Sequence, residues 1–338
     1  MSRVALVEEH NRLLDAALAY RDSKPLLVAL DYDLFSWIDR GRTSASALGR
    51  ALKLDARAVG IVLDAVSALG FLDKQGGHYA NTPLSRKLLV STSPHYRGAN
   101  MRYQNRMWEA WSDLKGVLRR GRPRRALVDW IAKNSFTPDY VRAMGDVAWT
   151  PARDLASQLD LKGVGRMLDV GCGPGVYSRA LVEREPTIEA TLLDYPKTIR
   201  VARRILKAHP RARRFRFKPA DFLRDDLGRE AYDLALLSNV THMESSANNE
   251  RLVEKTVRAL KPGGRLVIHD YVRDPGGRDS KFVAMLAVHL LVFTGRGNVY
   301  TLEDYVRWMR RFGLREIRHK RVALDTIYPS SAVVGRKP

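Results

Sequence analysis

An apolar run that leads directly into three alternating glycines is the strongest constraint on this chain of 338 residues. Residues 167–175 read Met-Leu-Asp-Val-Gly-Cys-Gly-Pro-Gly, and a helical segment follows them. Glycines at alternate positions let the backbone turn sharply and approach a ligand, because no Cβ lies in the way. The pattern therefore predicts a buried strand, a ligand-binding loop and a helix, in that order.

This loop departs from the dinucleotide-binding pattern. That pattern is Gly-x-Gly-x-x-Gly, and Val176 stands where its third glycine would be. Asp169 also places a carboxylate two residues before the first glycine. A carboxylate suits a ligand with a cationic ammonium and sulfonium, whereas it suits a pyrophosphate poorly. We therefore predict that Asp169, Gly171, Gly173 and Gly175 bind such a cationic ligand.

Strand-like runs alternate with helical segments from Arg166 onward, which predicts an α/β fold with a mostly parallel, doubly wound sheet. The predicted strands are residues 167–170, 190–193, 214–218, 234–237 and 265–269. The segment from about residue 94 to residue 150 is predicted to be helical and is rich in large side chains, in contrast to the alternating strands and helices that follow. We therefore expect a boundary between two regions near residues 150–160.

Further candidate ligand-binding residues follow these strands, where open parallel sheets bind their ligands. Asp194 ends the second strand and is predicted to hold ribose hydroxyls, unless it only caps the next helix. Asp221 and Phe222 follow the third strand, where the carboxylate could accept from an adenine amino group while the ring packs on the base. The alternative for Asp221 is an ordinary turn residue. Three neighbours are assigned to the same site: Tyr195, Ser238 and Asn239.

The first ninety or so residues contain a winged-helix pattern. Thr43 or Ser44 is predicted to cap a helix over 45–52, and a second helix spans 55–69. Two short strands, 71–73 and 78–80, flank a Gly-Gly turn. The second helix carries an apolar stripe that a lone small module could not fully bury: Val59, Val62, Val66 and Leu69.

The chain resembles the small-molecule O-methyltransferases of class I that carry an N-terminal winged-helix dimerisation domain, such as the acetylserotonin, hydroxyneurosporene and caffeate enzymes. Besides the glycine loop, the resemblance rests on Lys261-Pro-Gly-Gly-Arg265, Leu69-Gly-Phe-Leu72, Tyr79-Ala-Asn-Thr82, Tyr300-Thr-Leu-Glu303 and Phe312-Gly-Leu314. It implies a Rossmann-like seven-stranded sheet, S-adenosylmethionine as methyl donor, no metal, and a homodimer. It also implies three regions: a dimerisation domain over 1–95, a helical linker over 96–155, and a catalytic domain over 156–338.

The resemblance assigns a general base to His242, which follows the fourth strand. A phenol has a pKa of about 10 and an imidazole about 6.5, so a well-placed histidine can take the proton as methyl transfer begins. Plant-type enzymes follow this histidine with Asp-Trp, whereas this chain has Met243-Glu244, which leaves C- or N-methylation open. Asp270 is the first candidate for orienting His242, and Glu303 is the second. The candidate walls of an aromatic-rich pocket are Met101, Tyr103, Trp108, Trp149, Met285, His289 and Phe293.

The net charge of +21 leaves nucleic acid open as an alternative partner, because a large positive charge favours binding to polyanions. Arg119–Arg125 reads RRGRPRR, and residues 200–218 carry nine Lys or Arg with no acid. The alternatives are an RNA or DNA methyltransferase and a DNA-binding regulator. Against the former, the fourth strand is followed by Ser-Asn-Val-Thr rather than the Asn/Asp-Pro-Pro-aromatic turn of base amino methylation.

The cysteine content and the apolar segments indicate a cytoplasmic protein without a membrane span. Cys172 is the one cysteine and lies in the glycine loop, so we expect neither disulfides nor a cysteine-built metal site. Residues 1–10 have no signal-peptide core. The longest apolar stretch, 282–293, is too short to cross a bilayer.

Overall fold

The computed structural model of the protein describes residues 3–132 and 137–338, so residues 1–2 and 133–136 of the predicted regions 1–95 and 96–155 lie outside the described part. The chain divides into two units, residues 1–108 and 109–338. The predicted change of character near residues 150–160 therefore falls inside the second unit, where α10 (Thr137–Gln158) ends.

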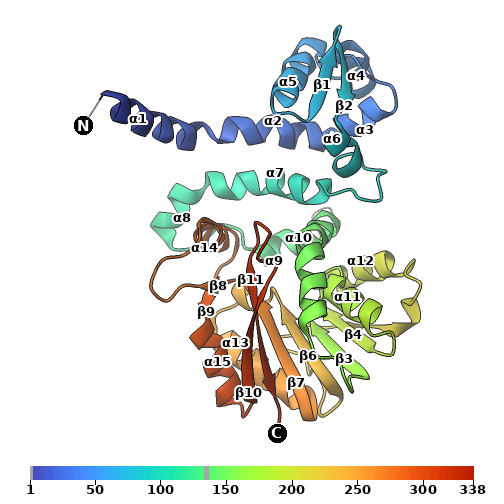
Figure 1. Ribbon diagram of the computed structural model, residues 1–338, viewed down its shortest axis with the longest axis vertical. Helices are drawn as coiled ribbons and strands as arrows, with labels where there is room; N and C mark the ends of the chain where they lie inside the picture. Colours follow the sequence, from blue (N-terminus) through green and yellow to red (C-terminus); the bar gives the residue numbers. More distant parts are fainter. Residues whose placement is uncertain (1–2, 133–136) are drawn as a thin grey trace. The chain divides into compact units, whose positions relative to one another are not determined.

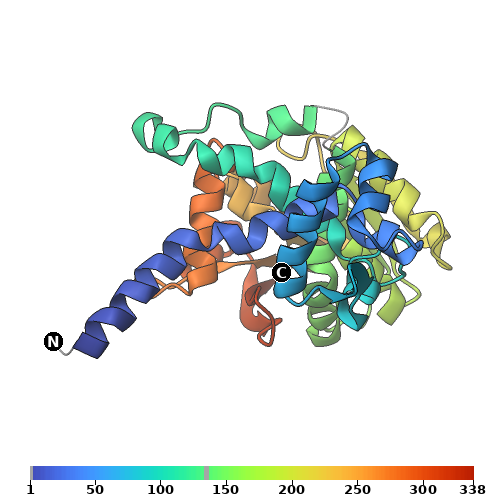
Figure 2. The ribbon, with the colours of Figure 1, turned by 90° about the horizontal axis from the view of Figure 1, so that it is seen from above.

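The first unit is a set of helices around one small hairpin. Its elements are α1 (Arg3–Leu18), α2 (Tyr20–Asp31), α3 (Leu34–Asp39), α4 (Ala45–Leu52), α5 (Ala56–Ala68), β1 (Leu72–Gln75), β2 (His78–Asn81), α6 (Pro83–Leu88) and most of α7 (Gly98–Ser112). The side chain of Ser44 accepts from Ala47 N–H and caps α4, while Asp55 caps α5 in the same way. The predicted helices and hairpin are confirmed, and α1 extends away from the rest of this unit (Figure 2).

The apolar stripe on α5, which we expected a lone small module to leave partly uncovered, is mostly buried within its own unit. Val59 and Val66 lie in the core of the first unit itself, together with Leu63, and Val62 packs against that core. Val59, Val62 and Val66 are therefore covered inside the unit, where α2, α4 and β1 pack on α5, and Leu69 is half-buried. Several exposed apolar side chains of this unit lie on α1 instead, where Leu13 is 71% exposed.

The second unit is built on one seven-stranded sheet. Its strands are β3 (Arg166–Val170), β4 (Glu189–Asp194), β5 (Phe215–Pro219), β6 (Tyr232–Ser238), β7 (Leu260–Asp270), β10 (Arg315–Val322) and β11 (Ser330–Arg336). Their order across the sheet is β10-β11-β7-β6-β3-β4-β5 (Figure 1). The five strands from β7 to β5 are parallel, and β11 runs antiparallel to its neighbours. The predicted parallel strands and the expected seven-stranded sheet are confirmed.

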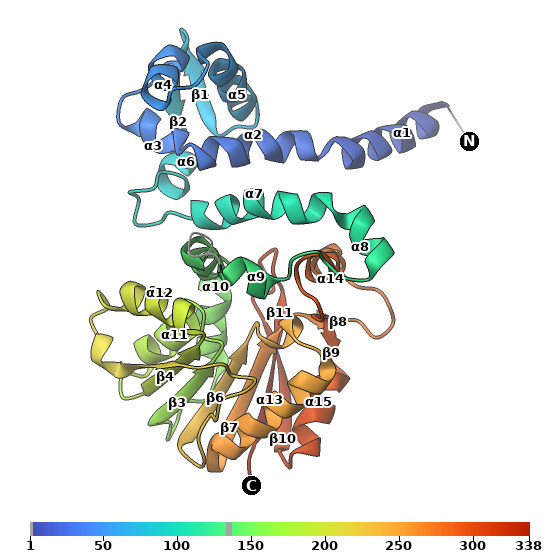
Figure 3. The ribbon, with the colours of Figure 1, turned by 180° about the vertical axis from the view of Figure 1, so that it is seen from behind.

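Helices cover both faces of this sheet (Figures 1 and 3). One face packs on α10, α11 (Val176–Arg184) and α12 (Pro196–Leu206), with Leu155, Leu181 and Ile199 in the shared core. The other face packs on α13 (Ser246–Ala259) and α15 (Leu302–Arg311), where Leu252 and Trp308 are buried. The carboxyl ends of the parallel strands consequently meet at one edge, as in other doubly wound folds.

Shorter elements complete the second unit. These are α8 (Leu114–Arg120), α9 (Leu127–Ala132), η1 (Ala212–Arg214), η2 (Thr241–Met243), β8 (Val272–Arg273), α14 (Lys281–Phe293) and β9 (Tyr300–Thr301). Two of them, η2 and β8, directly follow the carboxyl ends of β6 and β7. Among the described residues, no helix has both the length and the apolar character needed to cross a bilayer.

Candidate active site

The glycine loop connects β3 to α11 and adopts a backbone that requires glycine. Gly171, Gly173 and Gly175 have φ of +68°, +54° and +80°, a region that side chains with a Cβ rarely adopt. A Cβ on Gly171 would lie 2.5 Å from Val240 Cγ2, just beyond the end of β6. The loop can therefore approach the end of β6 closely only because no side chain is present there.

Two buried carboxyl groups flank the loop. Asp169 accepts a hydrogen bond from Ser178 Oγ (2.6 Å), and burial raises its pKa to about 7. Asp194 accepts from Gly173 N–H (2.9 Å) and Tyr195 N–H (2.7 Å). Burial raises the pKa of Asp194 to about 6 in spite of these two donors. Both carboxyls are thus held in surroundings that favour a cationic or hydroxyl-bearing ligand beside them.

The residues predicted to surround an adenine are partly brought together. The rings of Tyr195 and Phe222 lie 5.4 Å apart between their centroids, at the ends of β4 and β5. The carboxylate of Asp221 accepts from Leu223 N–H (2.9 Å) and lies 3.6 Å from Arg224, so it forms the turn that was the alternative reading for this residue.

Two oxygen atoms at the end of β6 are buried without a hydrogen-bond partner in the described part of the chain, Ser238 Oγ and Asn239 Oδ1. Asn239 has φ +55°, and its Nδ2 donates to Tyr177 Oη (3.0 Å) on α11. Buried polar atoms without a partner are uncommon in native proteins. These acceptors therefore suit a ligand that brings hydrogen-bond donors to the carboxyl end of β6, beside the glycine loop.

His242 follows these residues in η2 and contacts Asp270 at the end of β7. His242 Nδ1 lies 2.6 Å from Asp270 Oδ1, and His242 N–H donates to Asp270 Oδ2 (3.1 Å). Burial would raise the pKa of Asp270, but the facing imidazole and the hydrogen bonds from His242, Thr241 and Tyr271 lower it below its ordinary value. Asp270 is therefore an ionised acceptor, so Nδ1 carries the imidazole proton and Nε2 keeps its lone pair.

A hydroxyl network that the sequence did not indicate supports this pair. Thr241 Oγ1 donates to Asp270 Oδ2 (2.5 Å), and Tyr305 Oη lies 3.2 Å from Thr241 Oγ1. Glu303, the second candidate for orienting His242, is exposed in the first turn of α15. Of the two candidates, Asp270 is the one in contact with His242.

The candidate pocket walls are divided between the two units. Met101 packs against the core of the first unit, and Tyr103 is a buried residue of the same unit. The ammonium of Lys24 lies 4.3 Å from the ring centroid of Trp108. In the second unit Trp149 is 38% exposed and lies against the Arg153 guanidinium.

Three further candidates lie on α14. Met285 is 47% exposed, whereas Phe293 is buried. The ring of Phe293 lies 5.2 Å from that of His289.

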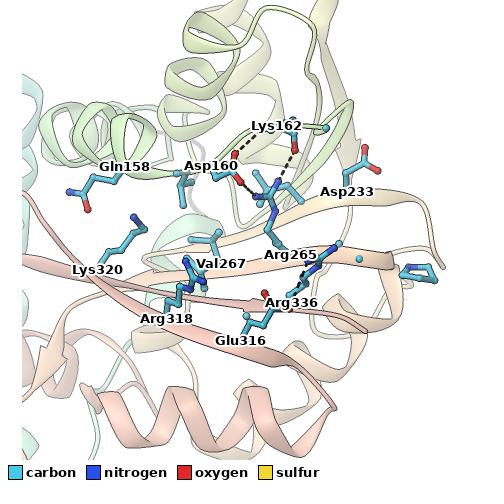
Figure 4. Close-up of a pocket in the computed structure, with 18 residues that line it drawn as sticks. Gln158, Asp160, Lys162, Asp233, Arg265, Val267, Glu316, Arg318, Lys320 and Arg336 are labelled. Carbon is cyan, nitrogen blue, oxygen red and sulfur yellow. Dashed lines mark hydrogen bonds and ion pairs between the residues drawn. The ribbon is translucent and has the colours of Figure 1, made fainter.

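A solvent-open hollow of about 550 Å³ lies at the other end of the sheet, at the amino ends of β6 and β7 (Figure 4). Cations and acids share its lining, with Arg265 3.2 Å from Asp160 and Arg336 3.8 Å from Glu316. The glycine loop and His242 instead follow the carboxyl ends of β3 and β6. The hollow is therefore separate from the candidate active site. Within residues 3–132 and 137–338, no group of three or more His, Cys, Asp or Glu side chains is arranged to hold a metal.

Two protein families match this chain. An O-methyltransferase domain matches residues 121–315, which is more than half of the chain, and an O-methyltransferase dimerisation domain matches residues 14–91. The chain belongs to the O-methyltransferase family.

Relatives of this O-methyltransferase are similar over nearly its whole length. A 3-hydroxy-5-methyl-1-naphthoate 3-O-methyltransferase of Streptomyces sahachiroi is 27% identical over 92% of this chain and 91% of its own. The N,N-dimethyltransferase OxyT of Streptomyces rimosus is 24% identical over 99% and 98%. The structure of human N-acetylserotonin methyltransferase with S-adenosylmethionine is 22% identical, with a TM-score of 0.86 over 97% of each chain, and shows that the fold is shared.

The segment after the histidine of this O-methyltransferase has a structural role that accounts for Met243-Glu244. Glu244 is buried and pairs with Arg296, which follows α14, at 2.7 Å. Met243 belongs to the apolar cluster that α14 forms with Tyr271. Met243 and Glu244, which stand where plant-type enzymes have Asp-Trp, therefore connect η2 to α14 and to the loop after it.

The main-chain carbonyls of this segment are held by three separate elements. Thr241 O accepts from Asn249 Nδ2 (2.9 Å) on α13, and His242 O accepts from Asn298 N–H (3.0 Å). Glu244 O accepts from Tyr300 Oη (2.6 Å) on β9. The backbone around His242 is thus fixed independently of the imidazole contacts, which is typical of a preorganised catalytic group.

Proposed function

We propose that this O-methyltransferase transfers the methyl group of S-adenosylmethionine to an acidic hydroxyl of a small aromatic or conjugated acceptor, with His242 as general base. The observation that carries the proposal is the contact of 2.6 Å between His242 Nδ1 and Asp270, beside the glycine loop. An ionised carboxylate on Nδ1 leaves Nε2 able to accept a proton, and it stabilises the imidazolium that results.

The residues at the strand ends fit S-adenosylmethionine, which supplies an electrophilic methyl group on a sulfonium when bound. Asp169 and Asp194 are buried carboxyls beside the loop, and Ser238 and Asn239 offer unused acceptor oxygens. The ammonium, sulfonium and ribose hydroxyls of the methyl donor are the cationic and donor groups that such acceptors suit. Tyr195 and Phe222 would hold its base.

The residues of this chain then have a limited task. His242 Nε2 removes the hydroxyl proton as the oxygen–methyl bond forms and the sulfur–methyl bond breaks, so the proton ends on the imidazole. Asp270 holds the ring in the orientation and tautomer that this transfer requires. The apolar and aromatic surroundings, including Tyr271, whose ring lies 6.0 Å from that of His242, exclude water and align the reacting atoms.

Cofactor binding should depend on pH because both buried carboxyls have raised pKa values, about 7 for Asp169 and about 6 for Asp194. A cationic ligand favours their ionised forms, so binding lowers both pKa values and releases protons. We expect the affinity for S-adenosylmethionine to rise from pH 5.5 to pH 8, as measured by calorimetry in buffers of different ionisation enthalpy. S-adenosylhomocysteine, which lacks the sulfonium charge, should show a smaller rise, and proton uptake at pH 6.5 would contradict the assignment.

We further propose that the protein is a homodimer through its first unit. The dimerisation-domain match supports this proposal, and so do the apolar residues on one face of α1, where Leu6, Val7 and Leu13 are 55%, 52% and 71% exposed. Leu14 lies on the same face, because residues seven apart on a helix share a side. Such a face is costly to leave in water and suits a matching face of a second copy.

The double variant Leu6→Glu/Leu13→Glu should therefore shift the protein toward a monomer, since it places two carboxylates on the proposed interface. Light scattering at micromolar concentration in moderate salt measures the mass. Arg12→Glu is the matched control, because it changes the net charge equally but lies on the opposite face of α1. A double variant that remains as dimeric as the control would count against this interface, and a monomeric wild-type protein would refute the proposal.

A further inference from the structure

The hollow at the amino ends of β6 and β7 is lined mainly by charged side chains (Figure 4). Its walls are the end of α10, the loop before β3, and the strands β6, β7, β10 and β11. Its volume of about 550 Å³ lies in the usual range of small-molecule sites. The cations of the lining are Lys162, Arg265, Arg318, Lys320 and Arg336, and its acids are Asp160, Asp233 and Glu316.

Each acid of the hollow already has a cationic partner. One of these partners, Lys261, is not part of the lining, so the acids occupy only two of the five lining cations. The pairs are Asp233 with Lys261 at 2.8 Å, Asp160 with Arg265 at 3.2 Å, and Glu316 with Arg336 at 3.8 Å. The remaining cations of the hollow therefore exceed the acids that could neutralise them.

Three lining cations have no ion pair or side-chain hydrogen bond in the part of the chain that the structure describes: Lys162, Arg318 and Lys320. Lys162 attracts Asp160 only at longer range. Arg318 and Lys320 alternate on β10, so they stand on the same face, about 7 Å apart along the strand. Cations gathered in a hollow without matching acids create a positive potential that attracts anions.

The two paired guanidiniums of the hollow differ in how firmly they are held. Arg336 and Glu316 have side chains that are 55% and 61% exposed, and such exposed pairs contribute little to stability. Arg336 can therefore leave Glu316 for a more highly charged anion at small cost. Arg265 is 20% exposed and also donates to Lys162 O (3.2 Å), so it fixes the loop before β3 as a wall.

We propose that this hollow binds a diphosphate group, as the free anion or within a diphosphate ester, through Arg318, Lys320 and Lys162. A diphosphate carries about three negative charges near pH 7, which matches the three cations without partners. Guanidinium groups hold phosphate oxygens through paired N–H donors. Two linked phosphates also reach cations from both β10 and the loop before β3, which a single phosphate spans less well. The site is independent of methyl transfer and lies at the opposite end of the sheet from the glycine loop.

The test is calorimetry on the full-length protein with S-adenosylhomocysteine present, using pyrophosphate, ADP and inorganic phosphate as probes. Pyrophosphate should bind once per chain and about tenfold or more tightly than phosphate, with an affinity that falls as salt is added. Tighter binding of ADP than of pyrophosphate would indicate an ester as the ligand, and the reverse order the free anion; both results support the site. No measurable binding of either probe, or equal binding of pyrophosphate and phosphate, would overturn it.

Variants locate the binding. Arg318→Gln/Lys320→Gln should weaken pyrophosphate about tenfold or more, and Lys162→Gln alone should weaken it less. Neither variant should lower the melting temperature without ligand by more than the control does, because these side chains have no partners to lose. The matched control is Arg200→Gln/Arg204→Gln, which removes the same charge from the exposed face of α12. An equal loss of affinity in this control, or full affinity in both β10 and Lys162 variants, would refute the proposal.

Discussion

The variant His242→Ala should lower turnover by about 10²–10⁴-fold at neutral pH, the usual contribution of a general base. Its affinity for S-adenosylmethionine should stay nearly unchanged, because His242 contacts Asp270 rather than the glycine loop. The defect should shrink at high pH, where a phenol ionises without help. Steady-state kinetics from pH 6 to pH 10, with calorimetry for the cofactor, measure both effects.

Two further variants test whether the loss of turnover is specific to His242 and its orientation. Asp270→Asn should give an intermediate loss, since an amide can leave His242 in the wrong tautomer. His319→Ala is the matched control, because that histidine lies exposed on β10. If His242→Ala keeps full turnover at neutral pH, the acceptor needs no base. The enzyme would then methylate a carbon, a nitrogen or an already ionised oxygen, and the similarity to an N,N-dimethyltransferase would become the better guide.

The second large effect is expected at Asp194. Asp194→Ala should weaken S-adenosylmethionine binding about 100-fold or more, because it would remove the proposed charge-assisted hydrogen bonds to the ribose and also removes the acceptor for Gly173 and Tyr195 N–H. Calorimetry measures the loss. Asp226→Ala is the control, since that side chain is 67% exposed, and an unchanged affinity in Asp194→Ala would exclude this position from the cofactor site.

The stability of Asp194→Ala separates a binding role from a purely structural one. Burial raises the pKa of Asp194 to about 6, above its usual 3.8, so its contribution to folding is present below pH 3.8 and is lost as the pH rises through 6. At pH 8 the ionised, buried carboxylate therefore stabilises the free protein little. We expect the melting temperature without ligand to change less at pH 8 than at pH 5, although cofactor affinity collapses at pH 8.

Local sequence signals predicted much of the fold and the conformation of the glycine loop. Gly171, Gly173 and Gly175 are informative because their backbone angles and close contacts arise within one strand–loop–helix segment. Asp194 and His242 could be placed because parallel strands gather their carboxyl ends at one edge. Such signals depend on a few neighbouring residues, and tertiary contacts do not change them.

Other features depend on contacts between distant residues and could not be predicted. Trp111 and His289 are 178 positions apart, and neither residue indicates the other in the sequence. Asp270 and Glu303 were both plausible partners of His242, and only the packing of β7 beside β6 distinguishes them. The stripe on α5 was expected to remain partly uncovered in a lone module, because periodicity shows that a face is buried but not which element covers it.

The way the Thr241–Glu244 carbonyls are held has a consequence for protein engineering. Asn249, Asn298 and Tyr300 fix the main chain around His242 from α13, the loop after α14, and β9. The side chains of α14 that pack toward His242 take no part in these bonds. If His242 is the general base, as proposed, substitutions on that helical face would change acceptor choice while the main chain around the imidazole stays aligned, so substrate range could evolve separately from the base.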